Sequence, residues 1–204
     1  MVQQLGVASS VDVGRDVARD VDMVMSDIVS DLSVVYKGPL IFVQSGAASL
    51  AASGCWQSAA SDQGVDSRCF DLHQHPSRLV PVSNIDVGTE TCHSMKPEAF
   101  RAAIGKIHVA CISGGNGRSL IEVLTLFTPL FGRVAYLVVD DWFQPGHRAA
   151  KRCTARGIGA ERAFRSWHKL HPRWVVDKVA PCRLKTFDSP RFSGQVLKLT
   201  WVND

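Results

Sequence analysis

The sequence predicts an α/β fold in which helices cover both faces of a mostly parallel sheet. Short apolar runs typical of buried strands alternate with segments whose apolar residues recur at helical spacing. Strands that are separated by helices and apolar on both faces are typical of parallel sheets, so we expect a doubly wound sheet. The last two strands have no helical pattern between them, which predicts an antiparallel C-terminal hairpin at one edge.

The first expected element is an amphipathic helix that ends near Gly38 and Pro39 and packs at an edge of the sheet. Its apolar residues recur at helical spacing among aspartates: Val17, Val21, Val24, Ile28 and Leu32. We assign residues 1–37 to this N-terminal helical segment and residues 38–204 to one α/β domain. The helix is followed by a short apolar strand at 40–43 and an alanine-rich helix at 50–60.

The remaining elements follow in the same alternation. A second strand at 68–70 stops at Asp71, and a weaker third strand spans 81–87. A helix at 97–104 has proline in its first turn, where the missing N–H costs nothing. A strongly apolar strand at 107–112, an amphipathic helix at 119–131 and a buried strand at 134–139 come next. The chain closes with a basic helix at 146–170, broken near 157–159, and strands at 174–179 and 195–202.

Length and composition favour one well-cored domain: the chain has 204 residues, of which 46% are hydrophobic and 21% charged. No apolar run approaches the roughly 20 residues that span a bilayer, and aspartates stand where a signal peptide would be basic and then apolar. We therefore expect a soluble, cytoplasmic protein with no membrane partner. The six cysteines form no C-x-x-C pair, so we expect free, reduced thiols.

Positive charge is concentrated in residues 144–191, which carry twelve Lys or Arg against three acids, a net charge of +9. Such a stretch favours an anionic substrate, RNA or a larger protein assembly as partner. The alternative is a solvated helix face whose cations meet the acidic N-terminal segment.

Polar residues follow four of the expected strands at their carboxyl ends, where open α/β sheets bind ligands. These positions are Gln44 to Ser49, Asp71, Ser113 to Gly117, and Asp140-Asp141-Trp142. An acid after the second strand suits a ribose diol, because a carboxylate accepts hydrogen bonds from both hydroxyls. Asp71 is thus a candidate ribose ligand.

These segments together resemble a class I S-adenosylmethionine-dependent methyltransferase with its Rossmann-like fold. The likeness is to small O-methyltransferases in which an Asp-Asp-aromatic sequence follows the fifth strand. It rests on four features: "IFVQSGAASLAAS", "RCFDLHQHP", "IHVACISGGNGRSLIEVLTLFTPLFGRVAYLVVDDWFQPG" and the terminal pair of strands.

The resemblance implies a role for each matching residue. Ser45, Gly46 and Ala48 would contact the methionine part of the cofactor, and Leu72 would lie near its adenine. Ser113 and Gly114 would lie beside the site of methyl transfer. Asp140 and Asp141 match the acidic pair that helps bind Mg²⁺ in metal-dependent members, and His147 just beyond them is a candidate general base.

Several departures from the family pattern keep other functions open. Gln44 and Ala48 stand where glycines are usual, and Ser113, Gly115 and Asn116 replace the two acids and histidine of the fourth turn. Two adjacent aspartates alone make a poor Mg²⁺ site, so we expect no tight metal binding. The expected activity is methyl transfer to an oxygen of a small molecule or sugar. The alternatives are a catalytically inactive structural or partner-binding subunit and an RNA-binding or RNA-modifying methyltransferase.

Overall fold

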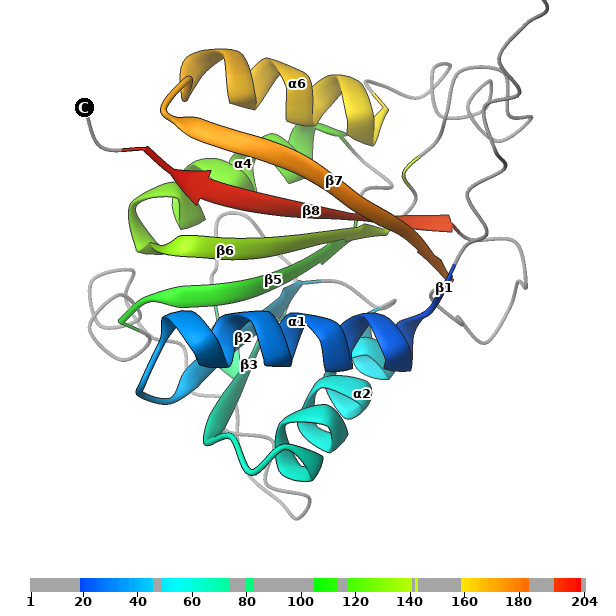
Figure 1. Cartoon of the computed structure of the whole chain (residues 1–204). Helices are drawn as coiled ribbons and strands as arrows, with labels where there is room; N and C mark the ends of the chain where they lie inside the picture. Colours follow the sequence, from blue (N-terminus) through cyan, green and yellow to red (C-terminus); the bar gives the residue numbers. More distant parts are fainter. Residues whose placement is uncertain are drawn as a thin grey trace, which may run out of the picture.

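The computed structural model describes residues 19–45, 49–73, 80–82, 105–113, 117–140, 142, 159–183 and 193–202. They form one eight-stranded sheet of order β1-β7-β8-β6-β5-β2-β3-β4 with helices on both faces (Figure 1). The elements are β1 (Arg19–Asp20), α1 (Val21–Val35), β2 (Leu40–Ser45), α2 (Ser49–Asp62), β3 (Ser67–His73), β4 (Val80–Val82), β5 (Ile107–Ser113), α4 (Gly117–Phe127), a 3₁₀ turn (Thr128–Leu130), β6 (Phe131–Asp140), α6 (Ala160–Leu170), β7 (Trp174–Arg183) and β8 (Ser193–Trp201).

The predicted Rossmann-like α/β architecture is confirmed. Strands β3, β2, β5 and β6 run parallel to one another, while β8 runs antiparallel to both β6 and β7. Because β8 lies between β6 and β7, the C-terminal hairpin extends the sheet with its strands in reversed order. The two-residue strand β1 pairs with the outer side of β7, which the sequence pattern did not predict. The strand expected at 81–87 is seen as β4, which pairs antiparallel with β3. The expected helix at 97–104 lies outside the described residues.

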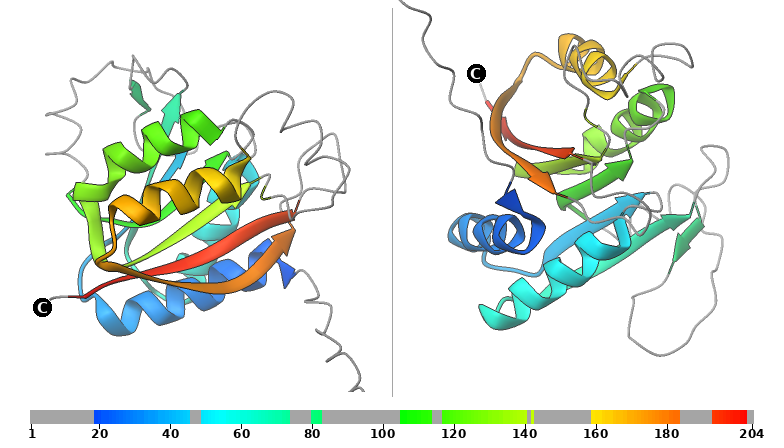
Figure 2. Two further views of the ribbon diagram at one scale, coloured as in Figure 1. Left: turned by 90° about the horizontal axis from the view of Figure 1, so that it is seen from above. Right: turned by 90° about the vertical axis from the view of Figure 1, so that its right-hand side faces the viewer.

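Two apolar cores sandwich the sheet, because the side chains of its central strands alternate between the faces. Ile41 and Val43 of β2 pack with α4 and α6 on one face. Leu40 and Phe42 pack with α1 and α2 on the other face. Figure 2 shows the two pairs of helices on opposite sides of the strands.

The N-terminal helix lies on a face of the sheet, and the expectation that it packs at an edge is wrong. Its buried residues belong to the same core as α2, β2, β5 and β6. The core-facing residues of α1 are Val21, Val24, Met25, Ile28, Val29 and Leu32. The helical period was read correctly, but it defines only which face of the helix is buried.

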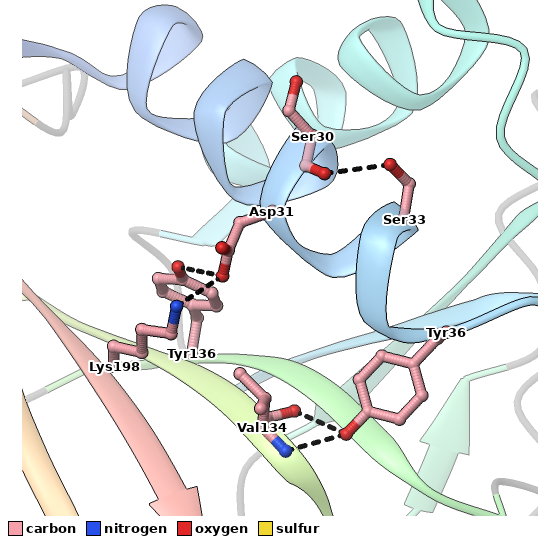
Figure 3. A network of polar contacts seen from close by, with 7 residues as sticks. All are labelled: Ser30, Asp31, Ser33, Tyr36, Val134, Tyr136 and Lys198. Atoms are coloured by element: carbon pink, nitrogen blue, oxygen red, sulfur yellow. Dashed lines mark hydrogen bonds and ion pairs between the residues drawn. The ribbon is translucent and has the colours of Figure 1, made fainter.

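A polar triad fixes α1 to the sheet (Figure 3). Asp31 of α1 accepts hydrogen bonds from the Tyr136 hydroxyl at 2.6 Å and from Lys198 Nζ at 2.7 Å. Partial burial raises the pKa of Asp31, but the bonds from Lys198 and Tyr136 and the charge of Lys198 outweigh it, so the pKa is lowered overall. Asp31 is thus held as a carboxylate that joins α1 to β6 and β8.

Two aromatic side chains bond to the backbone where the strands are irregular. The register between β5 and β6 shifts between Ile107 and Val109. The Tyr36 hydroxyl donates to the Val134 carbonyl and accepts from the Val134 N–H, both at 2.8 Å (Figure 3). His108 Nδ1 accepts the Ile41 N–H at 2.9 Å, and its ring meets that of Tyr36 edge-on at 4.3 Å. These bonds satisfy backbone groups that would otherwise be buried without partners.

Replacing Gly132 by alanine is expected to destabilise the protein, because a Cβ atom there would collide with the Tyr36 hydroxyl. Overpacking of this kind costs about 1–3 kcal/mol of unfolding free energy. Gly54→Ala on α2 is the matched control: nothing lies within 4 Å of the added atom, so the substitution should raise helix stability. Urea unfolding of both variants measures the difference, and equal stabilities would contradict the collision.

His108 is expected to make the protein lose stability in mild acid. Burial lowers the pKa of His108 from 6.5 to about 4, so the folded state stays unprotonated while the unfolded state takes up a proton. The contribution of His108 to the free energy of unfolding is complete above pH 6.5 and is lost as the pH falls toward about 4. The pKa of Asp31 is lowered, so Asp31 takes up its proton only at lower pH.

The control for this effect is His108→Asn, whose side-chain oxygen can take the place of Nδ1 but does not titrate. Urea unfolding at a series of pH values should give a flatter pH dependence in this range for the variant than for the wild type. Parallel curves would mean that His108 is protonated equally in both states.

Candidate ligand site at the carboxyl edge of the sheet

The carboxyl ends of four neighbouring parallel strands meet at one edge of the sheet. Ser45, the last residue of β2, is in register with Leu72 of β3 and Ile112 of β5. Ser113, the last residue of β5, is in register with Asp140, the last residue of β6. Adjacent strands lie about 4.8 Å apart, so the fold gathers these predicted site positions along one line.

Asp71 differs from its expected place at the end of a strand. Strand β3 continues for two residues to His73, and Asp71 pairs with Gln44 on one side and with Val82 of β4 on the other. The aspartate thus lies inside the sheet, one residue before the level of Ser45. The pairing with β4 extends β3 beyond the point at which the apolar run ends.

The other predicted site residues are Gly46, Ala48, Gly114, Asp141 and His147. All five lie outside the described residues. Their assigned roles therefore stay predictions. Trp142, which follows the acidic pair, is buried and meets Phe164 of α6 at a ring distance of 5.7 Å. It contributes to the core beneath α6.

Gln44 is the residue whose importance the sequence did not reveal. Its side chain is 1% exposed, and neither its amide nitrogen nor its amide oxygen has a hydrogen-bond partner within the part of the chain that the structure describes. A buried amide without partners is costly, and native structures contain few of them. The signal available in the sequence was a polar residue directly after the apolar run Leu40 to Val43.

The predicted metal pair is described only in part, because Asp141 lies outside the described residues. No three His, Cys, Asp or Glu side chains gather as a metal-binding group among the residues that the structure places. Asp140 stands opposite Ser113, which has no charge to offer a cation. Magnesium needs about six oxygen ligands, so Asp140 with this neighbour leaves most positions unfilled.

The basic stretch is partly visible in α6 and β7. On α6 the residues Ala163, Phe164 and Trp167 are buried, while Arg162 and Arg165 are exposed. Glu161 pairs with Arg165 at 2.7 Å and lies 3.9 Å from Lys178. Arg165 thus pairs within its own helix, and acidic α1 lies on the opposite face of the sheet.

Cysteine chemistry and membrane crossing can be examined only for the described residues. Among them Cys55, Cys69, Cys111 and Cys182 carry thiols rather than disulfides, and burial raises the pKa of Cys69 to about 12. No helix in the described part of the chain combines the length and apolar character needed to cross a membrane.

Comparison with known proteins finds structural likeness without sequence likeness. No protein-family model and no curated protein sequence matches the chain. The structure of the O-methyltransferase NovP matches with a TM-score of 0.53 at 13% identity, over 89% of this chain and 79% of NovP. The DszA carbon methyltransferase matches with a TM-score of 0.45 at 12% identity, over 87% of this chain and 53% of its own.

A further match is the O-methyltransferase TomG from Streptomyces achromogenes in complex with SAM, with a TM-score of 0.44 at 12% identity, over 88% of this chain and 80% of TomG. Identities this low speak for the fold alone, and of these three only the match to NovP has a TM-score above 0.5. Together with the strand order and the antiparallel β8, that match shows that the chain has the Rossmann-like α/β fold of S-adenosylmethionine-dependent methyltransferases.

Proposed function

We propose that the chain is an S-adenosylmethionine-dependent methyltransferase that acts on an oxygen of a small molecule or sugar. The observation that carries this proposal is the strand register, which brings Ser45, Ser113 and Asp140 to the carboxyl ends of β2, β5 and β6, with Asp71 of β3 one residue before the level of Ser45. Ligands of open α/β sheets bind at this edge.

The orphaned amide of Gln44 is a second feature that fits an absent polar ligand, because it lies buried one residue before the end of β2. In the proposed site Asp71 accepts hydrogen bonds from the ribose hydroxyls, and Ser45 with the turn after it borders the methionine part. Leu72 lies toward the adenine, and Ser113 lies beside the acceptor.

The chemistry that this chain must supply is positioning and proton removal. Bound S-adenosylmethionine would supply a methyl group activated by its positively charged sulfur. In the proposed site Asp140 takes the proton of the acceptor hydroxyl, so that the oxygen becomes a better nucleophile at the moment of transfer. His147 is the alternative base.

An anionic acceptor such as RNA is the alternative that the charge of residues 144–191 favours. Protein that neutralises phosphates binds RNA with an affinity that falls steeply as salt is raised. Filter binding of a structured RNA at about 50 mM and about 200 mM salt separates the two acceptor classes. A salt-insensitive or undetectable interaction would leave the small-molecule oxygen as the acceptor.

Asp71→Ala is expected to weaken the binding of S-adenosylhomocysteine by roughly 10- to 100-fold, because hydrogen bonds to a charged group are lost. Calorimetric titration of wild type and variant with S-adenosylmethionine and S-adenosylhomocysteine measures the effect, and added Mg²⁺ should change neither affinity.

The matched control is Asp66→Ala, which removes an exposed carboxylate just before β3, at the opposite end of the same strand. This variant should bind like the wild type. If the wild type itself binds neither compound at millimolar concentration, the proposed function fails and the fold serves as a structural or partner-binding subunit.

A further inference from the structure

The two faces of the sheet carry helices of opposite charge. On one face, α1 and α2 contain four aspartates and neither lysine nor arginine. On the other face, α6 contains the cations Arg162, Arg165 and Lys169 and one acid, Glu161. Figure 2 shows these helices on opposite sides of the strands. An anionic partner is therefore repelled by the first face and attracted to α6.

The three cations of α6 lie along one line on its outer face. The apolar side of the helix is buried in the core, and Arg162, Arg165 and Lys169 are exposed on the other side. Because these residues are spaced by three and then four positions, their side chains are neighbours on the helix surface. The line from Arg162 to Lys169 is about 10 Å long, from the rise of an α-helix. We call these three residues the α6 strip.

The α6 strip has more positive charge than its surroundings neutralise. Arg165 pairs with Glu161 at 2.7 Å, and the Glu161 side chain is only 16% exposed. Lys178 of β7 lies 3.9 Å from the same carboxylate. Neither Arg162 nor Lys169 forms an ion pair with an acid in the described part of the chain. One carboxylate that is largely covered thus stands against four cations.

The composition of the strip suits phosphate groups better than a protein surface. Ser166 is the exposed residue between the cations, and Leu170 at the helix end is the one exposed large apolar residue of α6. A stable protein interface has an apolar centre, whereas a single exposed leucine is ordinary. Arginine binds phosphate oxygens through two parallel hydrogen bonds, and a nucleic acid presents its phosphates in a row.

We propose that the α6 strip, with Lys178 beside it, binds a nucleic acid through its phosphate backbone. This inference goes beyond the proposed function, because α6 covers a face of the sheet whereas the proposed reaction takes place at the carboxyl edge. Binding on α6 requires neither the cofactor nor a methyl acceptor. A nucleic acid held there is a docked partner.

The test titrates the protein, without S-adenosylmethionine, with a fluorescent oligouridylate of about 16 nucleotides over a series of salt concentrations. The double variant Arg162→Gln with Lys169→Gln leaves the pair of Arg165 and Glu161 intact. It should bind roughly tenfold more weakly than the wild type at about 100 mM salt. The slope of log affinity against log salt should become shallower by about 1.4, because each phosphate contact with a single strand contributes about 0.7. Oligodeoxythymidylate of the same length distinguishes DNA from RNA as the source of the phosphates.

The matched control is Lys37→Gln with Lys106→Gln, which removes the same charge from two exposed lysines outside α6. Lys37 follows α1 and Lys106 precedes β5. This variant should bind nearly as tightly as the wild type. A second control, Arg162→Lys with Lys169→Arg, keeps both charges on α6 and should also bind like the wild type.

Three results would overturn the inference. Equal losses in the α6 variant and in the Lys37 and Lys106 variant would mean that the RNA responds only to net charge. Oligoglutamate that binds as tightly as oligouridylate would assign the strip to acidic proteins. Salt-dependent RNA binding that the α6 variant leaves intact would place the RNA elsewhere, as at the carboxyl edge.

Two further measurements keep the test decisive. Should the α6 variant not fold, crosslinking of 4-thiouridine RNA to the wild type must label the peptide that contains α6, and labelling confined to other peptides would contradict the proposal. Calorimetry with S-adenosylhomocysteine tests the proposed function separately. A wild type that binds RNA through α6 but does not bind S-adenosylhomocysteine would end the proposed function and support the role of the strip.

Discussion

Two-sided burial of the central parallel strands is the constraint on which the rest of this fold depends. Residues of β6 alternate between the two cores, with Leu137 and Val139 on one face and Tyr136 and Val138 on the other. Every polar group in such a strand must find a partner inside the protein or lose free energy on folding. The helices α1 and α2 on one face and α4 and α6 on the other provide this two-sided burial.

The polar groups near these strands show how the requirement is met. The Tyr136 hydroxyl bonds to Asp31, and Tyr36 and His108 bond to backbone groups near the shift between β5 and β6. All three arrangements stabilise the fold. Gln44 lies in the same kind of environment without such a partner among the described residues, as do the indole nitrogens of Trp56 and Trp174.

The fold was largely predictable because its signals are local. The apolar run from Ile107 to Ile112 and the helical period of α1 each depend on neighbouring residues, and both elements are present. The position of α1 on a face of the sheet involves contacts between residues that are far apart in the sequence, such as Asp31 with Lys198. No local pattern carries that information. The two-residue strand β1 is too short to produce a pattern at all.

The site was predictable only as a row of positions. Parallel strands bring their carboxyl ends to one edge, so Ser45, Ser113 and Asp140 could be grouped before the structure was known. The sequence presented Gln44 as a departure from a glycine pattern, because neither its burial nor its lack of partners can be read from its neighbours. The level of Asp71 within β3 depended on the pairing with β4, which lies beyond the apolar run.

The wide separation of Asp31 and Lys198 also has a consequence for synthesis on the ribosome. The two residues are 167 positions apart, and β8, which carries Lys198, is inserted between two strands that are made earlier. While the chain is being translated, α1 can gather α2 and the first strands, but its ionic anchor does not yet exist. The nascent chain must therefore hold one sheet edge of β6 open until β8 emerges, and during that interval it is most exposed to strand pairing with other chains.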